Sequence, residues 1–267
     1  MSAIISSVLF LCILCLGVSG SCVVAQEEPW HDQEFIADSF EKIALRREYS
    51  TNAKQNMIRK WLRPIRVYVQ STVGDSNLQK EMVGVQINHL ASITGHRIGF
   101  VNSIDSANLI LVFTLKKNIK NSMKSLGLYN NGSDAILQEA ACLGTITAAN
   151  NGEILNAAIH IPVDSTRYSG VFLNCIVEEI TQVMGLLNDS AEVFPSIFND
   201  QSVDGYLSGL DYLLLKLLYH PKIRAGMKED QVRIIVTGLL SELGADGFIA
   251  SASAKVLPNS IRAWSGD

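Results

Sequence analysis

The segment 108–115 (NLILVFTL) constrains the fold most, because so apolar a run is typical of a β-strand covered on both faces. An earlier segment, 65–69 (IRVYV), alternates with period two and predicts a strand, and 97–101 predicts another. Between them, 76–93 (SNLQKEMVGVQINHLASI) predicts an amphipathic helix closed by a Thr-Gly pair. A strand, a helix and a strand at this spacing form a βαβ unit, so we expect a sheet that is at least partly parallel.

A hairpin signal occurs further along the chain. The segments Leu143–Ala148 and Ile154–Ile161 flank an Asn-Asn-Gly sequence, which is a strong signal for a tight turn. Two strands joined by such a turn are antiparallel neighbours, so they add an antiparallel edge to the sheet. The fold class predicted is therefore α/β (α+β) with a mixed sheet.

Helical patterns surround these strands. Residues 33–60 carry apolar positions at helical spacing, and Pro64 marks the end of that region. Residues 170–187 predict a helix that carries a polar motif. The segment 203–219 (VDGYLSGLDYLLLKLLY) is so apolar that its helix must be largely buried, and 228–243 predicts a last helix. We expect C-terminal helices around one core.

The chain divides into four predicted parts. They are a signal peptide at 1–25, an N-terminal helical arm at 26–62, the main domain at 63–250 and a C-terminal tail at 251–267. The length that remains after the signal peptide fits one domain with a sizeable core and a short arm.

The first residues indicate export. The apolar run 3–18 contains no charge and is shorter than the roughly 20 residues of a membrane-spanning helix. Small residues come after it, and Val-Val-Ala suits cleavage after Ala25. No Lys or Arg precedes the run, so an uncleaved signal that serves as an anchor is the alternative, as is a lipid on Cys22. The protein is expected to be periplasmic or secreted, or anchored to a membrane by one of these routes.

Charge and cysteine content narrow the partners and the compartment. A formal net charge of −4 argues against nucleic acid as a main partner, because phosphate binding needs a clustered positive field. Cys142 and Cys175 remain after the signal region, and two cysteines in an exported chain suggest one disulfide. Two buried free thiols are the alternative.

The helix at 170–187 presents a polar stripe. Offsets of four, seven and eleven residues return to one face of a helix, and this stripe starts at Glu178. Its further members are Gln182, Gly185 and Asp189. Gly185 is suited to ending the helix, since glycine accepts a left-handed conformation. The chain could then turn and bring Asn188 or Asp189 back toward the two polar side chains.

This segment resembles the active-site helix of metzincin peptidases, H-E-x-x-H-x-x-G-x-x-H, in which three histidines hold zinc and the glutamate activates the zinc-bound water. By this resemblance Glu178 and Gln182 take the first two ligand positions, and Glu179 takes that of the general base. Gly185 matches the glycine, and Asn188, or Asp189 one residue on, takes the third ligand position. Met227 resembles the methionine of the turn that comes next in metzincins. The order of elements is similar as well, so the resemblance implies a metzincin-like fold without the zinc-binding histidines.

The chain resembles more closely an uncharacterised bacterial family, domain of unknown function 2927, whose members carry the same glutamate-for-histidine motif. The matching pieces cover most of the chain after the signal; they are Arg59 to Val67, Cys142, Cys175 to Asp189, Ser196 to Asp200, and Leu218 to Met227. One departure is His220, where an aspartate is expected before the proline. The resemblance implies the fold and an exported or lipid-anchored protein, but no reaction.

The donor types decide which metal is plausible. Zinc favours imidazole and thiolate, whereas Glu178, Gln182 and Asp189 offer only oxygen, which suits calcium, magnesium or manganese. The sequence favours a peptidase-like fold, non-zinc or metal-free, that binds a peptide or an envelope protein in the cleft. The alternative is a metal-dependent peptidase or hydrolase with Glu179 as general base. Proton sharing between Glu178 and Glu179 is disfavoured, because neighbouring helix residues point about 100° apart.

Other candidates lie outside the motif. His160 could line a cleft beside its strand, which is taken as the substrate-binding edge, although a histidine bonded to a neighbour is the plainer interpretation. His89 and His96 are expected at the surface or at a helix end, and His220 could approach the cleft from near Met227. The loop that contains Asn199, Asp200 and Asp204 could contribute oxygen ligands.

Overall fold

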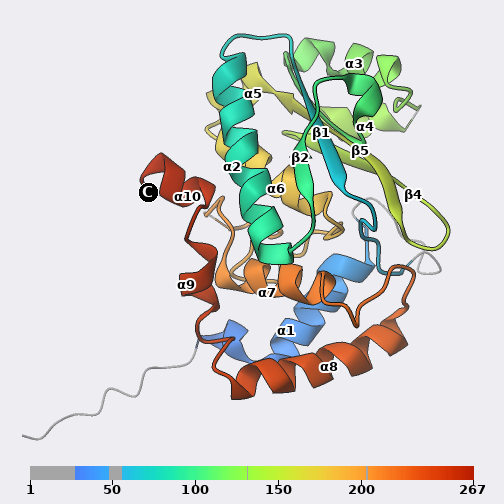
Figure 1. The fold of residues 1–267 in the computed structure, drawn as a ribbon. Helices are drawn as coiled ribbons and strands as arrows, with labels where there is room; N and C mark the ends of the chain where they lie inside the picture. The colour runs from blue at the N-terminus through green and yellow to red at the C-terminus, as the bar shows by residue number, and fades with distance from the viewer. Residues whose placement is uncertain (1–27, 48–55, 131, 203) are drawn as a thin grey trace, which may run out of the picture.

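The computed structural model describes residues 28–47, 56–130, 132–202 and 204–267. The predicted signal peptide and the predicted lipid site at Cys22 lie outside the described residues. Figure 1 shows a β-sheet flanked by helices, with a further group of helices below it. Within the described part of the chain, no helix has both the length and the apolar character needed to cross a membrane.

The sheet has five strands in the order β2-β1-β3-β5-β4. Their bounds are β1 Ile65–Ser71, β2 Ile98–Phe100, β3 Leu109–Thr114, β4 Leu143–Ala148 and β5 Ile154–Pro162. The pairs β1–β2, β1–β3 and β3–β5 are parallel, and β4 alone runs antiparallel, on β5. The mixed sheet, the βαβ unit and the antiparallel hairpin are confirmed. One expectation was wrong: β4 is the edge strand, whereas β5 lies inside the sheet.

Helices α2 (Ser76–Thr94) and α6 (Phe172–Gln182) pack against each other on the same side of the sheet. Gln86 of α2 donates a hydrogen bond from Nε2 to the Thr181 hydroxyl of α6 at 3.0 Å, and both side chains are buried. The inward residues of β3 and β5 alternate and belong to the same apolar core as these helices. This packing fixes α6 beside β4.

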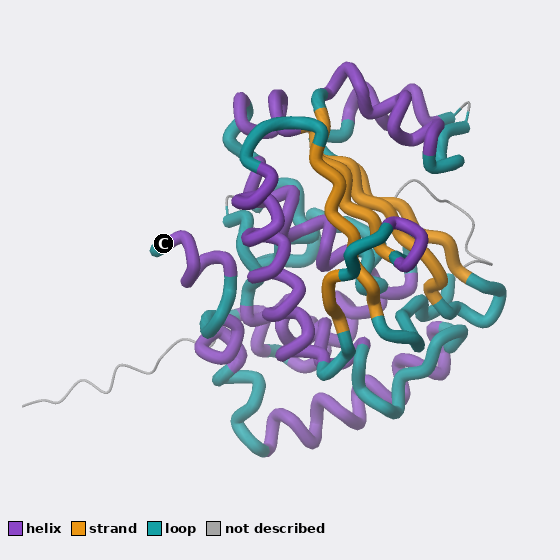
Figure 2. Tube along the Cα trace, turned by 45° about the horizontal axis from the view of Figure 1, so that its top comes forward, coloured by secondary structure: helices purple, strands orange, loops and turns teal. Residues whose placement is uncertain are grey.

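A lobe of two short helices, α3 (Ile119–Ser125) and α4 (Ser133–Glu139), lies between β3 and β4 in the sequence and beside the sheet in space (Figure 2). His160 of β5 points into this lobe, where its Nε2 lies 3.2 Å from the Ser122 hydroxyl. Its side chain is fully buried. The plainer interpretation, a strand histidine bonded to a neighbour, is confirmed, and the alternative that His160 lines the cleft was wrong.

The remaining core is helical. Below the sheet, α7 (Gly209–Leu218) lies against α1 (Gln33–Phe40), which continues into a π-helical turn, Glu41–Leu45, and α1 packs on α8 (Glu229–Ala245). The helix expected at 203–219 begins six residues later. The Ser208 side chain accepts from the Asp211 N–H and the Asp211 carboxylate accepts from the Ser208 N–H, which is a capping box.

Several shorter helices complete the chain. They are α5 (Val163–Tyr168), α9 (Ala252–Val256) and α10 (Ile261–Ser265), together with 3₁₀ turns at Pro29–His31, Ile104–Ser106 and Lys116–Asn118. Helix α1 contributes fully buried side chains to the same apolar core as the sheet.

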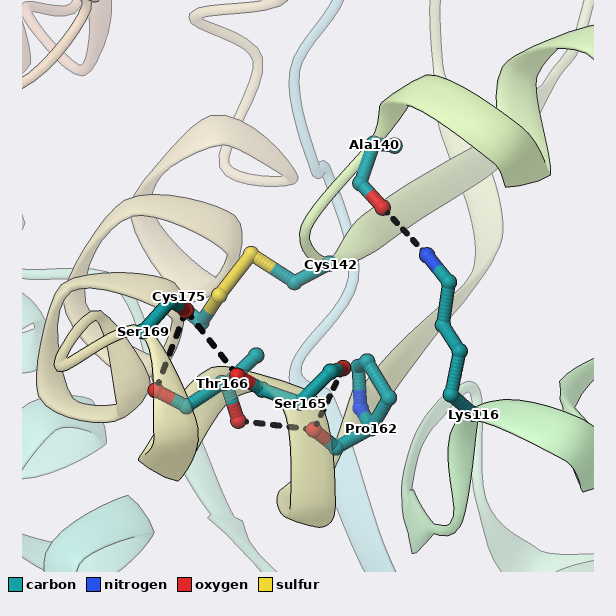
Figure 3. The surroundings of a disulfide bond; sticks show 8 residues. All are labelled: Lys116, Ala140, Cys142, Pro162, Ser165, Thr166, Ser169 and Cys175. Atoms are coloured by element: carbon teal, nitrogen blue, oxygen red, sulfur yellow. Dashed lines mark hydrogen bonds between the residues drawn. A yellow bond between two sulfur atoms is a disulfide. The ribbon is translucent and has the colours of Figure 1, made fainter.

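The predicted disulfide is present. Cys142, just before β4, bonds to Cys175 on α6, with 5.9 Å between their Cα atoms (Figure 3). Nearby, the Lys116 ammonium donates to the Ala140 carbonyl at 2.7 Å, which ties the start of the lobe to its end. The disulfide joins the edge strand to α6 covalently, and it indicates an oxidising compartment.

We expect His160 to make the protein sensitive to acid. Burial lowers the pKa of this imidazole to about 4, below the ordinary value of 6.5. Between these values the unfolded chain binds a proton that the folded chain does not, so the free energy of unfolding decreases as the pH falls through this window. The loss is up to about 3 kcal/mol. Denaturant unfolding of the wild type and His160→Gln across the window should give a flatter curve for the variant. Parallel curves would contradict this account.

Candidate functional site

The end of α6 sets the geometry of the site. Ile176, Ile180 and Val183 form the apolar stripe that the sequence predicts, and all three are buried. The regular helix ends at Gln182, earlier than expected, and the chain turns at Gly185, whose φ is +122°. A Cβ at Gly185 would lie 2.0 Å from the Arg59 carbonyl oxygen, so only glycine fits here.

This turn returns the chain toward α6. The Gln182 amide donates from Nε2 to an oxygen of Asp189 at 3.3 Å, so these two predicted residues are brought together. Asn188 points elsewhere: its amide donates to the Lys42 carbonyl at 3.0 Å and so holds the N-terminal helical region. Of the two candidates for the third position, Asp189 is therefore the one that lies with Gln182.

Three carboxylates meet at this point. One oxygen each from Glu178, Asp189 and Asp200 lies within 4.8 Å of the others. Glu178 comes from α6, Asp189 from the turn after it, and Asp200 from a loop before α7. Glu178 and Asp189 are half-buried, whereas Asp200 is exposed. Since like charges at this separation repel, the cluster favours a cation.

Glu179 lies on the sheet side of the helix. Its side chain is only 6% exposed and Gln182 is 8% exposed. Both approach Gly144 of β4: a Cβ at that position would lie 2.5 Å from Glu179 Oε2 and 3.8 Å from Gln182 Oε1. The edge strand therefore has a glycine where α6 presents an acid and an amide.

These residues lie in a groove made of three adjoining pockets. An acidic pocket of about 400 Å³ contains all the polar site residues; its lining includes Gly144, Glu178, Glu179, Gln182, Asp189 and Asp200. It shares Leu143, Gly144 and Gln182 with a pocket of about 440 Å³ that has mixed lining but contains most of the apolar side chains of the groove, and we call this the apolar pocket. It shares Cys142, Glu178 and Asp200 with a smaller polar pocket of about 210 Å³.

The apolar pocket lies along the outer edge of β4. One wall comes from α6 and the segment after it, and the other comes from the α3–α4 lobe. The apolar side chains include Met123, Leu128, Ile136, Val183 and Leu187, and Asn130, Ser133 and Thr145 add polar groups. Arg47 adds a positive charge to this pocket. Sequence reasoning missed the lobe and Arg47, because neither carries a motif and both reach β4 only through the tertiary fold.

Other predicted candidates lie apart from the groove. Met227 accepts at its sulfur from the Arg224 N–H, at 3.3 Å, and its carbonyl accepts from the Ile58 N–H. Among the described residues, those that line the three pockets do not include Met227 or His220. His89 is buried beneath the C-terminal helices rather than exposed.

Comparisons with known proteins give one match. The model of the family described as "Protein of unknown function (DUF2927)" matches residues 33–238, which include the sheet, α6 and all the residues of the acidic pocket. No curated protein and no solved structure matches the chain.

The turn that forms the site can be tested with two glycines. Gly185→Ala places a methyl group against the Arg59 carbonyl at a positive φ, so we expect a loss of more than about 2 kcal/mol in the free energy of unfolding. The matched control is Gly238→Ala on the exposed face of α8, where a Cβ meets open space. That change should stabilise the helix by about 0.5–1 kcal/mol. Equal effects in denaturant titrations would contradict the proposed role of Gly185.

Proposed function

Since the chain belongs to this family of unknown function, the site itself has to suggest the activity, and we propose that the protein is an exported binding protein for extended polypeptide segments. The segment lies in the groove along the outer edge of β4. The observation that carries the proposal is the position of that groove, whose walls come from both sides of an edge strand. The activity is binding, and the partner is a peptide or a protein of the cell envelope.

The edge of β4 supplies the main-chain part of recognition. Within the described residues β4 pairs only with β5, so its other edge is open to a further strand. An added strand lies about 4.8 Å away and gains main-chain hydrogen bonds regardless of its sequence. The α3–α4 lobe and α6 leave room beside this edge, which is consistent with a strand lying between them.

The pockets supply side-chain preference. Alternate residues of an extended segment point to the same side, about 7 Å apart. The apolar pocket suits a large aliphatic or aromatic side chain, and the adjoining acidic pocket suits a lysine or arginine. A segment with an apolar residue and a basic residue two positions apart satisfies both pockets.

Export is supported by two independent features. The disulfide Cys142–Cys175 closes between β4 and α6 at the groove itself, which fits an oxidising compartment. The first 25 residues of the sequence have the pattern of a signal peptide. The partner would then be a molecule outside the cytoplasm.

A direct test uses the heptapeptide Ser-Thr-Leu-Thr-Lys-Thr-Ser. We expect it to bind with a dissociation constant below about 1 mM, as is usual for short peptides that lose much conformational freedom. Its binding should perturb the amide resonances of β4 in an NMR titration. Replacing the lysine by glutamate, or the leucine by serine, should weaken binding by about tenfold or more.

Two matched glycine variants locate the binding. Gly144→Val pushes a side chain into the acidic pocket and should abolish binding of the heptapeptide, whereas Gly99→Val at the opposite edge of the sheet meets open space and should leave it intact. Equal affinity for all three peptides, or binding that survives Gly144→Val, would rule out the groove.

A second function is favoured by the three carboxylates. Glu178, Asp189 and Asp200, with Gln182 beside them, offer oxygen donors that suit calcium, magnesium or manganese and fit zinc poorly. A metal held there would polarise water, and Glu179 in the same pocket would accept its proton, as in a metal-dependent peptidase. We place this function second because the groove accounts for the apolar pocket as well as for the acids.

Calorimetric titration separates the two functions. A hydrolase predicts saturable binding of manganese or calcium that Asp189→Asn weakens at least about tenfold, while the exposed Asp105→Asn, outside the groove, leaves it unchanged. It also predicts peptide cleavage that Glu179→Gln abolishes with the fold intact. Heptapeptide binding that is unaffected by a chelator, without cleavage, favours the binding protein.

A further inference from the structure

The C-terminal residues 252–267 form a strap across the helical side of the molecule. They lie beyond the matched family region, which ends at residue 238. Helix α9 packs on α7, and α10 packs on α2 (Figure 1). Ala252, Val256 and Ile261 of the strap itself are buried. The strap is thus docked by apolar contacts on two helices that are far apart in the sequence.

Polar contacts latch the strap to the loop that precedes α7. The Arg262 guanidinium donates to Asp204 at 2.9 Å and lies over the ring of Tyr206. The Tyr206 hydroxyl donates to the carboxylate of Asp267 at 2.5 Å. A separate bond runs from the Trp264 indole N–H to Glu81 of α2, at 3.1 Å.

That loop is also a wall of the groove. Asn199, Asp200, Ser202 and Asp204 line the polar pocket that adjoins the acidic one. Asp200 supplies one of the three clustered carboxylates. The strap therefore bonds to Asp204 on the same loop that presents Asp200 to the groove.

His89 of α2 lies directly beneath the strap. Its side chain is only 1% exposed, and within the described residues neither ring nitrogen makes a hydrogen bond of ordinary geometry. Burial lowers the pKa of this imidazole. The backbone of Val256, in the strap, partly offsets this, because its interaction with the ring favours the protonated form. With His89, Tyr206 and Arg262 line a small cavity of about 10 Å³.

Burial makes the protonation of His89 unfavourable while the strap is docked. The cavity is also lined by Arg262 of α10, which is itself paired with Asp204, and by the neutral Tyr206, so among the described residues that line it no acidic side chain offsets the cost of burying a charge. The acidic groups of this region are engaged elsewhere: Glu81 by Trp264, Asp204 by Arg262, and Asp267 by Tyr206. When the strap leaves, water can hydrate a protonated His89 and the cost of burying its charge disappears. Acid therefore favours the undocked strap.

We propose that residues 252–267 are an acid-released strap that holds the Asp200 loop in place and so regulates the groove. The proposal rests on the proposed function, because it assigns a control to the same peptide-binding groove. When the strap is docked, the loop presents Asp200 and the acidic pocket is complete. When the strap leaves, the loop loses its bonds to Arg262 and Asp267, and peptides bind less tightly.

Hydrogen–deuterium exchange of the protein at about pH 7.5 and about pH 5.5 tests the strap without any peptide. After correction for intrinsic exchange, we expect the protection of residues 252–267 to fall about tenfold or more at the lower pH. His89→Met, which fills the same space and cannot be protonated, should keep that protection at both pH values. His96→Gln is the control, because His96 lies just beyond the end of α2 and bonds to the Arg63 carbonyl instead.

The same samples are then titrated with the heptapeptide Ser-Thr-Leu-Thr-Lys-Thr-Ser. The wild type should lose affinity at the lower pH, His89→Met should lose less, and Arg262→Ala should bind more weakly at both pH values. Acid release of the strap through His89 is refuted if the protection of residues 252–267 does not change with pH. It is also refuted if that protection changes as much in His89→Met as in the wild type. A protein that binds no peptide, yet releases the strap in acid, refutes the proposed function alone.

Discussion

The close approach of α6 to the edge strand β4 is the contact on which the site depends. At Gly144 the strand carries no side chain, and the space is filled by Glu179 and Gln182 from the helix. The disulfide from Cys142 to Cys175 joins the same two elements one turn away. Restricting the unfolded chain through a loop of 33 residues contributes roughly 3–4 kcal/mol, so this contact is well secured. The disulfide therefore holds the start of β4, which lines the groove, against α6.

Repulsion within the acidic pocket is the physical basis of the proposed preference for a cation. Two unit charges about 5 Å apart repel by about 1 kcal/mol in water, and by several times more when partly buried. Glu178, Asp189 and Asp200 make three such pairs, and the Gln182 amide donates to Asp189. A lysine, an arginine or a divalent ion relieves the same repulsion. The apolar pocket next to the cluster distinguishes them in the proposed function, because a polypeptide with an apolar and a basic side chain fills both pockets.

Much of the sheet could be predicted from the sequence, because its signals are local. The apolar stretch of β3, the alternation in β1 and the Asn-Asn-Gly turn each specify structure over a few residues, and β4 was predicted to the residue. The start of α7 was missed because the Ser208 capping box outweighed the apolar pattern before it. Helices α3 and α4 have only seven residues each, too few for a periodic pattern. The choice of Asp189 over Asn188 and the contribution of Arg47 depend on contacts between distant segments, which spacing does not reveal.

The positions of the motif residues bear on what the resemblance to peptidases means. A helix with Glu178, Glu179 and Gln182 does lie beside an antiparallel edge strand, and a glycine turn comes directly after it. Met227, however, packs with Ile58 and Arg224, apart from the pockets of the described chain. Catalysis needs a strongly polarised water, whereas a carboxamide and carboxylates in a broad groove are well suited to hold a strand with a basic side chain. The chemistry of these side chains therefore favours recognition over hydrolysis.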